Sequence, residues 1–222
     1  MNYYALIVAG GSGSRMNSDI PKQFLLLHQK PVLMHTIEAF YHSDLKPEII
    51  VALHKDYFKY WNDLCKIHNF NIPHKLVEGG TERFHSVKNG LKELKEKSIV
   101  AIHDALRPLI SNDLITRSFH EAREKGTAVA AVPSRDSIRQ LQNDTSIALD
   151  RKTIFIVQTP QVFWSDALKV AYQQDFDSSF TDDASVVEKA GIKINLIQGE
   201  LLNIKITYPE DIRIAELFFK EK

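Results

Sequence analysis

The feature that most constrains the fold is an alternation of short, continuously apolar runs with longer helical patterns. Runs such as EIIVAL (residues 48–53) and SIVAIHD (residues 98–104) are typical of parallel strands buried on both faces. Similar runs occupy residues 4–9, 74–78 and 127–133. The helices are expected between them, at residues 32–41, 57–68, 82–95 and 112–124. The alternation predicts an α/β fold with a Rossmann-like, doubly wound and mostly parallel sheet.

One segment breaks this alternation. Residues 136–157 contain two strand-like stretches around the turn QNDTS, which predicts a β-hairpin inserted into the α/β chain. The chain has 222 residues, a length that suits one domain of the larger α/β kind. We therefore expect a single domain over residues 1–222, with an arm at about 136–157 that packs on a second subunit.

Composition excludes several classes of function. Lys plus Arg and Asp plus Glu both number 28, so the chain lacks the basic excess of a nucleic-acid or acidic-membrane binder. The apolar run near the N-terminus is too short to span a bilayer, and no signal-peptide pattern precedes it. The single cysteine, Cys65, suits a reducing compartment, and we expect a cytoplasmic protein.

The loop after the first strand reads GGSGSRM and is followed by Lys22. Glycines at such a turn let backbone N–H groups approach phosphate oxygens. The loop lacks the Gly-Lys-Ser/Thr ending of a P-loop, and Met16 stands where a dinucleotide fingerprint needs its third glycine. Arg15 and Lys22 add cations that offset the charge developing in phosphoryl or nucleotidyl transfer. A tight turn with two solvated cations is the simpler alternative, and the loop alone leaves both open.

Ligands bind beyond the carboxyl ends of strands in a doubly wound sheet. Other predicted strands are followed by GGTERFHS, HDALRP, PSRDS and TPQVF, and Lys205 lies in LLNIKIT near the end of the chain. Gly, Ser, Thr, Arg and Asp therefore gather at the edge where a phosphate-bearing ligand would bind.

Taken together, these segments resemble a nucleotidyltransferase family that joins CTP to a sugar-alcohol phosphate. The resemblance is greatest to the 2-C-methyl-D-erythritol 4-phosphate cytidylyltransferases of non-mevalonate isoprenoid synthesis. The segments that carry it are AGGSGSRM, PKQF, EGGTERFHSV, HDALRP, PSRDS, LDRKTIFIVQTPQVF, TDDASVVEKAG and NIKITYPEDI, which span the chain in the family's order.

The resemblance implies a role for each matching residue. Arg15, Lys22 and Lys205 would be the catalytic cations at the phosphates. The nucleotide would contact Ala9, Gly10, Gly11, Gly80, Thr81, Ser86 and Asp104. The acceptor would contact Arg107, Arg135, Asp136, Ser137, Arg151 and Thr159, those of the arm from the neighbouring subunit of a homodimer. Mg²⁺ would bridge the phosphates, with Asp104 as the candidate protein ligand.

The expected reaction is attack of the acceptor phosphate on the α-phosphorus of CTP, with release of pyrophosphate. The nucleophile is already anionic, so positioning and charge neutralisation would carry the rate. We expect Lys22 and Lys205 to be exposed and to matter little for folding. Ribitol-5-phosphate cytidylyltransferase, which shares most of these motifs, and a non-catalytic nucleotide-binding module remain alternatives. Thr81 and Ser137 depart from the residues usual in the family, and Thr81 leaves the mode of cytosine recognition open.

Overall fold

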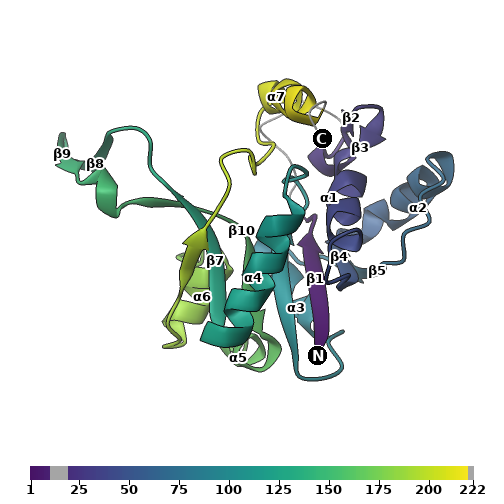
Figure 1. Ribbon diagram of the computed structural model, residues 1–222, viewed down its shortest axis with the longest axis horizontal. Helices are drawn as coiled ribbons and strands as arrows, with labels where there is room; N and C mark the ends of the chain where they lie inside the picture. The colour runs from purple at the N-terminus through teal and green to yellow at the C-terminus, as the bar shows by residue number, and fades with distance from the viewer. Residues whose placement is uncertain (11–19, 220–222) are drawn as a thin grey trace.

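A computed structural model describes residues 1–10 and 20–219 (Figure 1). Its centre is a seven-stranded sheet in the order β11-β7-β10-β6-β1-β4-β5. All of the neighbouring pairs are parallel except those of β10, which runs antiparallel to β6 and β7. The strands are β1 (Asn2–Val8), β4 (Glu48–Leu53), β5 (Lys75–Glu78), β6 (Ser98–Asp104), β7 (Thr127–Pro133), β10 (Phe155–Trp164) and β11 (Leu196–Gln198). The predicted α/β fold with a mostly parallel sheet is confirmed.

Helices cover both faces of the sheet because successive side chains of each buried strand point to opposite sides. In β1, Ala5 and Ile7 pack with one layer, whereas Tyr4 and Leu6 pack with the other. The first layer contains α1 (Val32–Tyr41), α2 (Phe58–Ile67) and α4 (Asn112–Lys125). The second contains α3 (Arg83–Leu91), α5 (Ser165–Ala171) and α6 (Asp183–Lys189).

The last helix, α7 (Pro209–Phe219), docks at the edge where the carboxyl ends of β1 and β6 lie (Figure 1). Its Ala215 is fully buried and joins Leu27, Val32, Leu109 and Ile206 in a small separate core. Leu27 belongs to a short hairpin of β2 (Leu26–Leu27) and β3 (Lys30–Pro31). This core fixes α7 and the segment before it beside the end of the sheet.

The inserted hairpin extends away from the sheet as an arm (Figure 1). It consists of β8 (Ile138–Gln142) and β9 (Thr145–Leu149), paired in a two-stranded sheet of their own. Asn143 in the two-residue turn has a φ of 52°, a left-handed conformation that asparagine tolerates. The hairpin is confirmed, but its second strand ends before a 3₁₀ turn, η4 (Arg151–Thr153), and residues 155–157 belong to β10.

Three shorter expectations change. The helix predicted to reach residue 95 ends at Leu91, where three successive turn hydrogen bonds replace the helical pattern. The segment TDDASVVEKAG suggests Thr181 as a helix cap, but Asp182 caps α6, accepting from Ser185 N at 2.9 Å. The segment TYPE suggests a capping box between Thr207 and Glu210, but at α7 Asp211 accepts from the backbone N–H groups of Thr207 and Tyr208. Within the described residues, no helix combines the length and apolar character needed to cross a membrane.

A half-buried histidine, His74, gives the fold a pH dependence. Trp61 Nε1 donates to His74 Nε2 at 2.8 Å, while His74 Nδ1 lies 2.8 Å from Ile72 O, so the ring is held neutral with its proton on Nδ1. Burial lowers the pKa of His74, with the Ile72 carbonyl opposing part of that shift. The unfolded chain therefore binds the proton more readily, and stability falls as the pH drops below the ordinary histidine value of about 6.5.

We expect His74→Gln, which keeps an acceptor for Trp61 but does not titrate, to flatten the fall in unfolding free energy between pH 7.5 and 5.5. The change in slope should stay below about 1.4 kcal/mol per pH unit, the limit for one proton. Urea unfolding at several pH values measures it. His120→Gln, at an exposed site, is the control and should leave the slope unchanged. A wild-type slope in His74→Gln would contradict the assignment.

Candidate active site

The site forms where β1 and β6 end side by side. The chain passes from β1 to β4 and β5 on one side and then returns to β6 on the other, so a topological switch point lies between β1 and β6. Ala9 follows β1, donating to Ala52 O at 2.8 Å and accepting from Gln23 Nε2 at 2.9 Å. Asp104 is the last residue of β6. The predicted gathering of polar residues at this edge is therefore present.

Three cations surround the carboxylate of Asp104. Arg83 Nε lies 3.5 Å from Oδ1, and Arg107 Nε and Lys205 Nζ lie 3.5 and 2.9 Å from Oδ2. Burial by itself would raise the pKa of Asp104, but Arg83, Lys205 and Arg107 together bring it well below its usual range. Asp104 is thus ionised at any working pH. The cavity beside it is lined by three cations, Arg83, Arg107 and Lys205, and by two carboxylates, Asp104 and Asp182.

A hydrogen-bonded chain fixes Asp104 from behind. Its backbone N–H donates to Thr159 Oγ1 at 3.0 Å, and that hydroxyl lies 3.1 Å from His103 Nδ1. His103 Nε2 lies 3.2 Å from Arg107 O. Burial lowers the pKa of His103 to about 3, so the ring is neutral and Thr159 donates to Nδ1. His103 therefore supports the site through hydrogen bonds and does not act as an acid or base.

The side chains around Asp104 border a cavity of about 250 Å³. It is lined by Arg83, Asp104, Arg107, Val157, Gln158, Thr159, Gln161, Thr181, Asp182 and Lys205. The lining includes four of the predicted site residues, namely Asp104, Arg107, Thr159 and Lys205. About a hundred positions separate the first of these residues from the last in the sequence. A cavity with three cations on its wall can hold phosphate groups and stabilise charge that builds up on them.

Arg83 is held by a second, fully buried carboxylate. Its Nη2 donates to Asp183 Oδ2 at 2.7 Å, and Tyr172 donates its hydroxyl to Asp183 Oδ1 at 2.6 Å. Burial would lower the pKa of Arg83, but the charges of Asp183 and Asp104 raise it well above the usual range. The guanidinium therefore bridges two carboxylates from different elements and ties α6 to the end of β6.

The comparisons with known proteins agree with one another. The family model described as IspD, 2-C-methyl-D-erythritol 4-phosphate cytidylyltransferase, matches residues 3–221. The chain belongs to this family. It is 48% identical over 214 residues to the cytidylyltransferase of that name from Azobacteroides pseudotrichonymphae, covering 96% of each chain. It is 46% identical over 211 residues to the one from Bacteroides fragilis, covering 95% of this chain and 96% of the other.

Solved structures of the family share the fold. The 4-diphosphocytidyl-2C-methyl-D-erythritol synthase of Anaerococcus prevotii superposes with a TM-score of 0.84 at 28% identity, covering 99% of this chain and 96% of the other. The 2-C-methyl-D-erythritol 4-phosphate cytidylyltransferase of Thermus thermophilus gives 0.78 at 28% identity, covering 99% and 100%. The resemblance inferred from the sequence motifs is confirmed.

The residues expected at the nucleotide lie together on the other side of β1. Gly80 N donates to Ser86 Oγ at 3.0 Å, and a Cβ added at Gly10 would lie 3.0 Å from the same oxygen. A Cβ at Gly80 would lie 2.2 Å from that of His85, so this position requires glycine. Thr81 is exposed, with Oγ1 3.2 Å from His85 Nδ1. Gly10, Gly80 and Ser86 are therefore closely packed together, whereas the side chain of Thr81 faces the surface.

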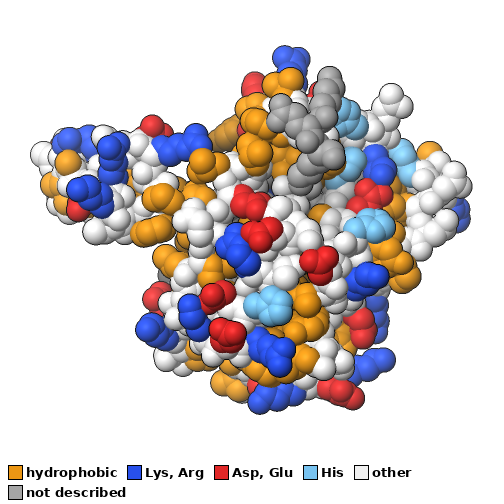
Figure 2. Space-filling view, viewed as in Figure 1, with side chains coloured by type: hydrophobic (Ala, Val, Ile, Leu, Met, Phe, Trp, Pro, Cys, Tyr) orange, Lys and Arg blue, Asp and Glu red, His pale blue; other side chains and the backbone are white. Residues whose placement is uncertain are grey.

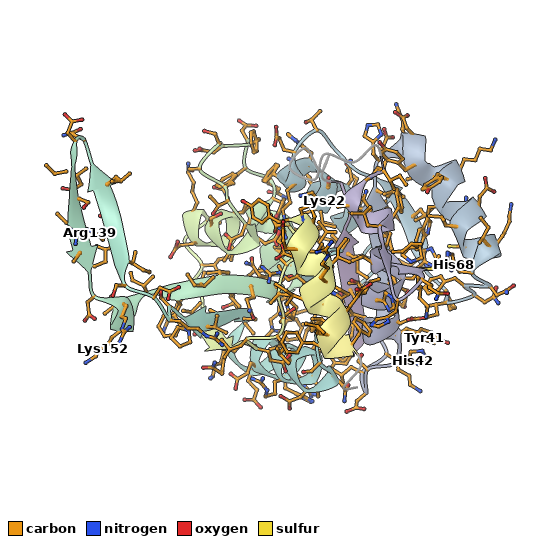
Figure 3. All side chains as sticks on the ribbon, turned by 90° about the horizontal axis from the view of Figure 1, so that it is seen from above. Lys22, Tyr41, His42, His68, Arg139 and Lys152 are labelled. Carbon is orange, nitrogen blue, oxygen red and sulfur yellow. The ribbon has the colours of Figure 1, made fainter. Side chains whose placement is uncertain are left out.

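The structure corrects the expectation that Lys22 is exposed. The residue is 6% exposed, and its Nζ donates to Thr207 O at 2.6 Å. Figure 3 shows it beside α7. Lys22 therefore connects the end of the opening loop to the segment that carries Lys205. Gly11 and Arg15, which we also expected at the phosphates, lie outside the described residues.

The four predicted residues of the arm lie apart from the Asp104 cavity. Arg135, Asp136, Ser137 and Arg151 are at the base of the hairpin, where Arg151 Nη1 donates to Arg135 O at 3.0 Å. They are absent from the lining of that cavity, which is formed by described residues of the same subunit. Their expected role at an acceptor therefore depends on a second subunit.

Sequence reasoning missed the groups that hold the site together. Arg83 stands inside the quoted motif GGTERFHS, but its partner Asp183 is 100 residues away. Asp182 caps α6 and Asp183 lies in its first turn, but the motif TDDASVVEKAG gives no sign that Asp183 also binds Arg83. The sequence held one indication of this pair: an arginine follows a predicted strand, and a carboxylate lies in another motif expected at the same edge of the sheet.

Proposed function

We propose that the chain transfers CMP from CTP to 2-C-methyl-D-erythritol 4-phosphate, giving 4-diphosphocytidyl-2-C-methyl-D-erythritol and pyrophosphate. Family membership over residues 3–221 carries this proposal. Lys205, Arg107 and Arg83 around one cavity at the switch point support it, because they can neutralise phosphate charge there. We propose that residues 1–222 act as one nucleotidyltransferase domain.

In the proposed reaction an oxygen of the acceptor phosphate forms a bond to the α-phosphorus, and the bond from that phosphorus to the bridging oxygen of pyrophosphate breaks. Lys205 would exchange its contact with Asp104 for the α-phosphate, while Arg107 and Thr159 border the acceptor. Lys22 would face the triphosphate together with Arg15. Gly10, Gly80 and Ser86 would hold the cytosine. No proton has to be removed from the nucleophile, which agrees with the neutral, backbone-bonded His103.

The donor set around Asp104 does not fit a divalent metal held by the protein alone. Both oxygens of Asp104 already face cations within 3.5 Å, and the described residues contain no group of three or more His, Cys, Asp or Glu arranged for a metal. We propose that Mg²⁺ enters with CTP, as part of the metal–nucleotide substrate, with Asp104 offering at most one oxygen. Such binding is usual for Mg²⁺, which keeps most of its ligands from phosphate and water.

Pyrophosphate release from CTP, measured with and without Mg²⁺, tests the proposed function. Methylerythritol phosphate should support turnover, and ribitol 5-phosphate should support far less. Equal turnover with ribitol 5-phosphate would overturn the acceptor, and equal turnover with ATP would overturn the cytosine site. The chain has one cysteine, Cys65, and so no internal disulfide, which suits the cytoplasmic location we propose.

We also propose that the arm forms a homodimer. Leu141 and Ile147 on the hairpin are 81% and 42% exposed, and a two-stranded hairpin is barely stable alone in water. Figure 2 shows basic side chains beside hydrophobic ones on the arm. Pairing with a second copy would bury the apolar side chains and bring Arg151 to the anionic acceptor of the other subunit.

We expect two inactive variants to restore each other when unfolded and refolded together. In a mixed dimer of Lys22→Ala with Arg151→Ala, one site would carry both defects and the other neither. Random pairing makes about half of the dimers mixed, so about a quarter of wild-type activity should return. The matched control mixes Lys22→Ala with Lys205→Ala, which serve the same site and should restore nothing. No recovery in the first mixture would contradict a shared site.

A further inference from the structure

Lys205 lies on a segment that has to be held in place by side chains. We call residues 199–207 the strap; it connects β11 to α7 (Figure 1) and, along its whole described length, forms neither helix nor strand. Ile206 anchors it, being fully buried and donating to Leu106 O at 2.8 Å. Lys205 itself is 45% exposed and meets Asp104 through the end of a long side chain. Its reach into the cavity is therefore only as well defined as the backbone of the strap.

Gln158 clamps the beginning of the strap. Its Nε2 donates to Glu200 O at 2.8 Å, and its Oε1 accepts from Glu200 N at 3.2 Å, so one amide satisfies both backbone groups of that residue. The approach is close enough that a Cβ at Gly199 would lie 2.5 Å from Gln158 Oε1. Gln158 is 6% exposed and comes from β10, whose next residue, Thr159, supports Asp104.

Asn203 fixes the middle of the strap on the same strand. It is fully buried, and its Nδ2 donates to Thr159 O at 2.7 Å and to Gln158 Oε1 at 3.4 Å. Its own carbonyl accepts from Arg107 Nη1 at 2.7 Å. The two amides thus interlock and connect the strap with both Thr159 and Arg107, two residues that border the cavity.

We propose that Gln158 and Asn203 are positioning residues, whose interlocked side-chain amides hold the strap so that Lys205 Nζ is placed for the transfer. This inference rests on the proposed function and adds to it two residues that act through the strap, of which Gln158 also lines the cavity. Displacement of a catalytic group by about 1 Å can cost about a hundredfold in rate. Loosening the strap should therefore lower kcat and leave the binding of CTP nearly unchanged.

A double-mutant cycle tests the inference. Asn203→Ala should lower kcat by about 10- to 100-fold, with the KM for CTP within about threefold of wild type. In a Lys205→Ala background the same change should lower kcat by less than about threefold, because there is no longer an ammonium group to place. Equal losses in both backgrounds would overturn the positioning role and leave a general structural one.

Two further variants make the cycle decisive. Gln158→Leu keeps the side-chain volume and removes the clamp, so it should repeat the pattern if Asn203→Ala folds poorly by circular dichroism. Asn195→Ala is the matched control: its amide joins the backbone at Lys125 and the Thr127 hydroxyl at the opposite end of the sheet, and kcat should stay within about twofold. If Lys205→Ala alone retained full kcat, the proposed role of Lys205 would fail, and the positioning inference with it.

Discussion

Replacing Lys205 by alanine is expected to lower kcat by two to three orders of magnitude, with little change in the KM for CTP. The Nζ atom lies 2.9 Å from Asp104 Oδ2 at the cavity, and in the proposed reaction it would turn from that carboxylate to the oxygens of the α-phosphate. Charge on those oxygens rises in the transition state, and loss of one such contact typically costs about 10²- to 10³-fold. Steady-state pyrophosphate release, with both substrates varied, measures the effect.

Two further variants show whether the charge of Lys205 or its exact position matters for kcat. Lys205→Arg keeps the charge but changes its geometry, so it should recover only part of the rate. Lys59→Ala, at an exposed position on α2, should leave kcat at the wild-type value. A Lys205→Ala enzyme with normal kcat and a raised KM would mean that Lys205 only binds the ground state.

Lys22→Ala should lower kcat by a similar factor. Because Lys22 is buried and donates to Thr207 O, the variant should also have a lower free energy of unfolding.

The strands and first helices were predictable because their cause is local. EIIVAL, SIVAIHD and TAVAAVP are continuous apolar runs, and they occupy β4, β6 and β7 to the residue. The helix expected at 82–95 ends at Leu91, one residue after Gly90, and turn hydrogen bonds follow it. Gly90 packs so closely on β1 that a Cβ there would lie 2.4 Å from Leu6, a tertiary contact that the helical pattern does not reveal. β11 was missed because three residues carry too little pattern to be seen.

The candidate site residues that belong to a motif following a strand could be predicted from the sequence. The contacts between side chains that are distant in the sequence could not. Asp104, Arg107, Thr159 and Lys205 each lie in a recognisable segment, and the rule for doubly wound sheets brings those segments to one edge. The burial of Lys22 and the pairing of Arg83 with Asp183 depend on which side chains meet across layers. Spacing along a chain carries no information about such contacts, since 100 residues separate that pair.

Replacing Arg83 by methionine is expected to destabilise the protein by about 3–5 kcal/mol, the usual cost of removing one partner from a buried ion pair. Asp183 is fully buried, and its Oδ2 would lose the guanidinium that donates to it at 2.7 Å, leaving the Tyr172 hydroxyl on Oδ1. The unfolding free energy from urea titration measures the effect, and kcat should fall as well because Arg83 also faces Asp104.

Two comparisons decide whether the loss of stability in Arg83→Met comes from the Asp183 carboxylate that is left without its partner. In the double variant Arg83→Met with Asp183→Leu neither charge remains, so it should be more stable than Arg83→Met alone, since apolar residues of similar volume often replace a buried pair without loss. Arg117→Met breaks a pair with Asp113 in which both side chains are more than a third exposed, and it should cost under about 1 kcal/mol. If Arg83→Met cost no more than Arg117→Met, the bridge between Asp183 and Asp104 would not be holding α6 to the site. Equal stability of the single and double variants would likewise place the loss in packing, because removing the second charge would then have relieved nothing.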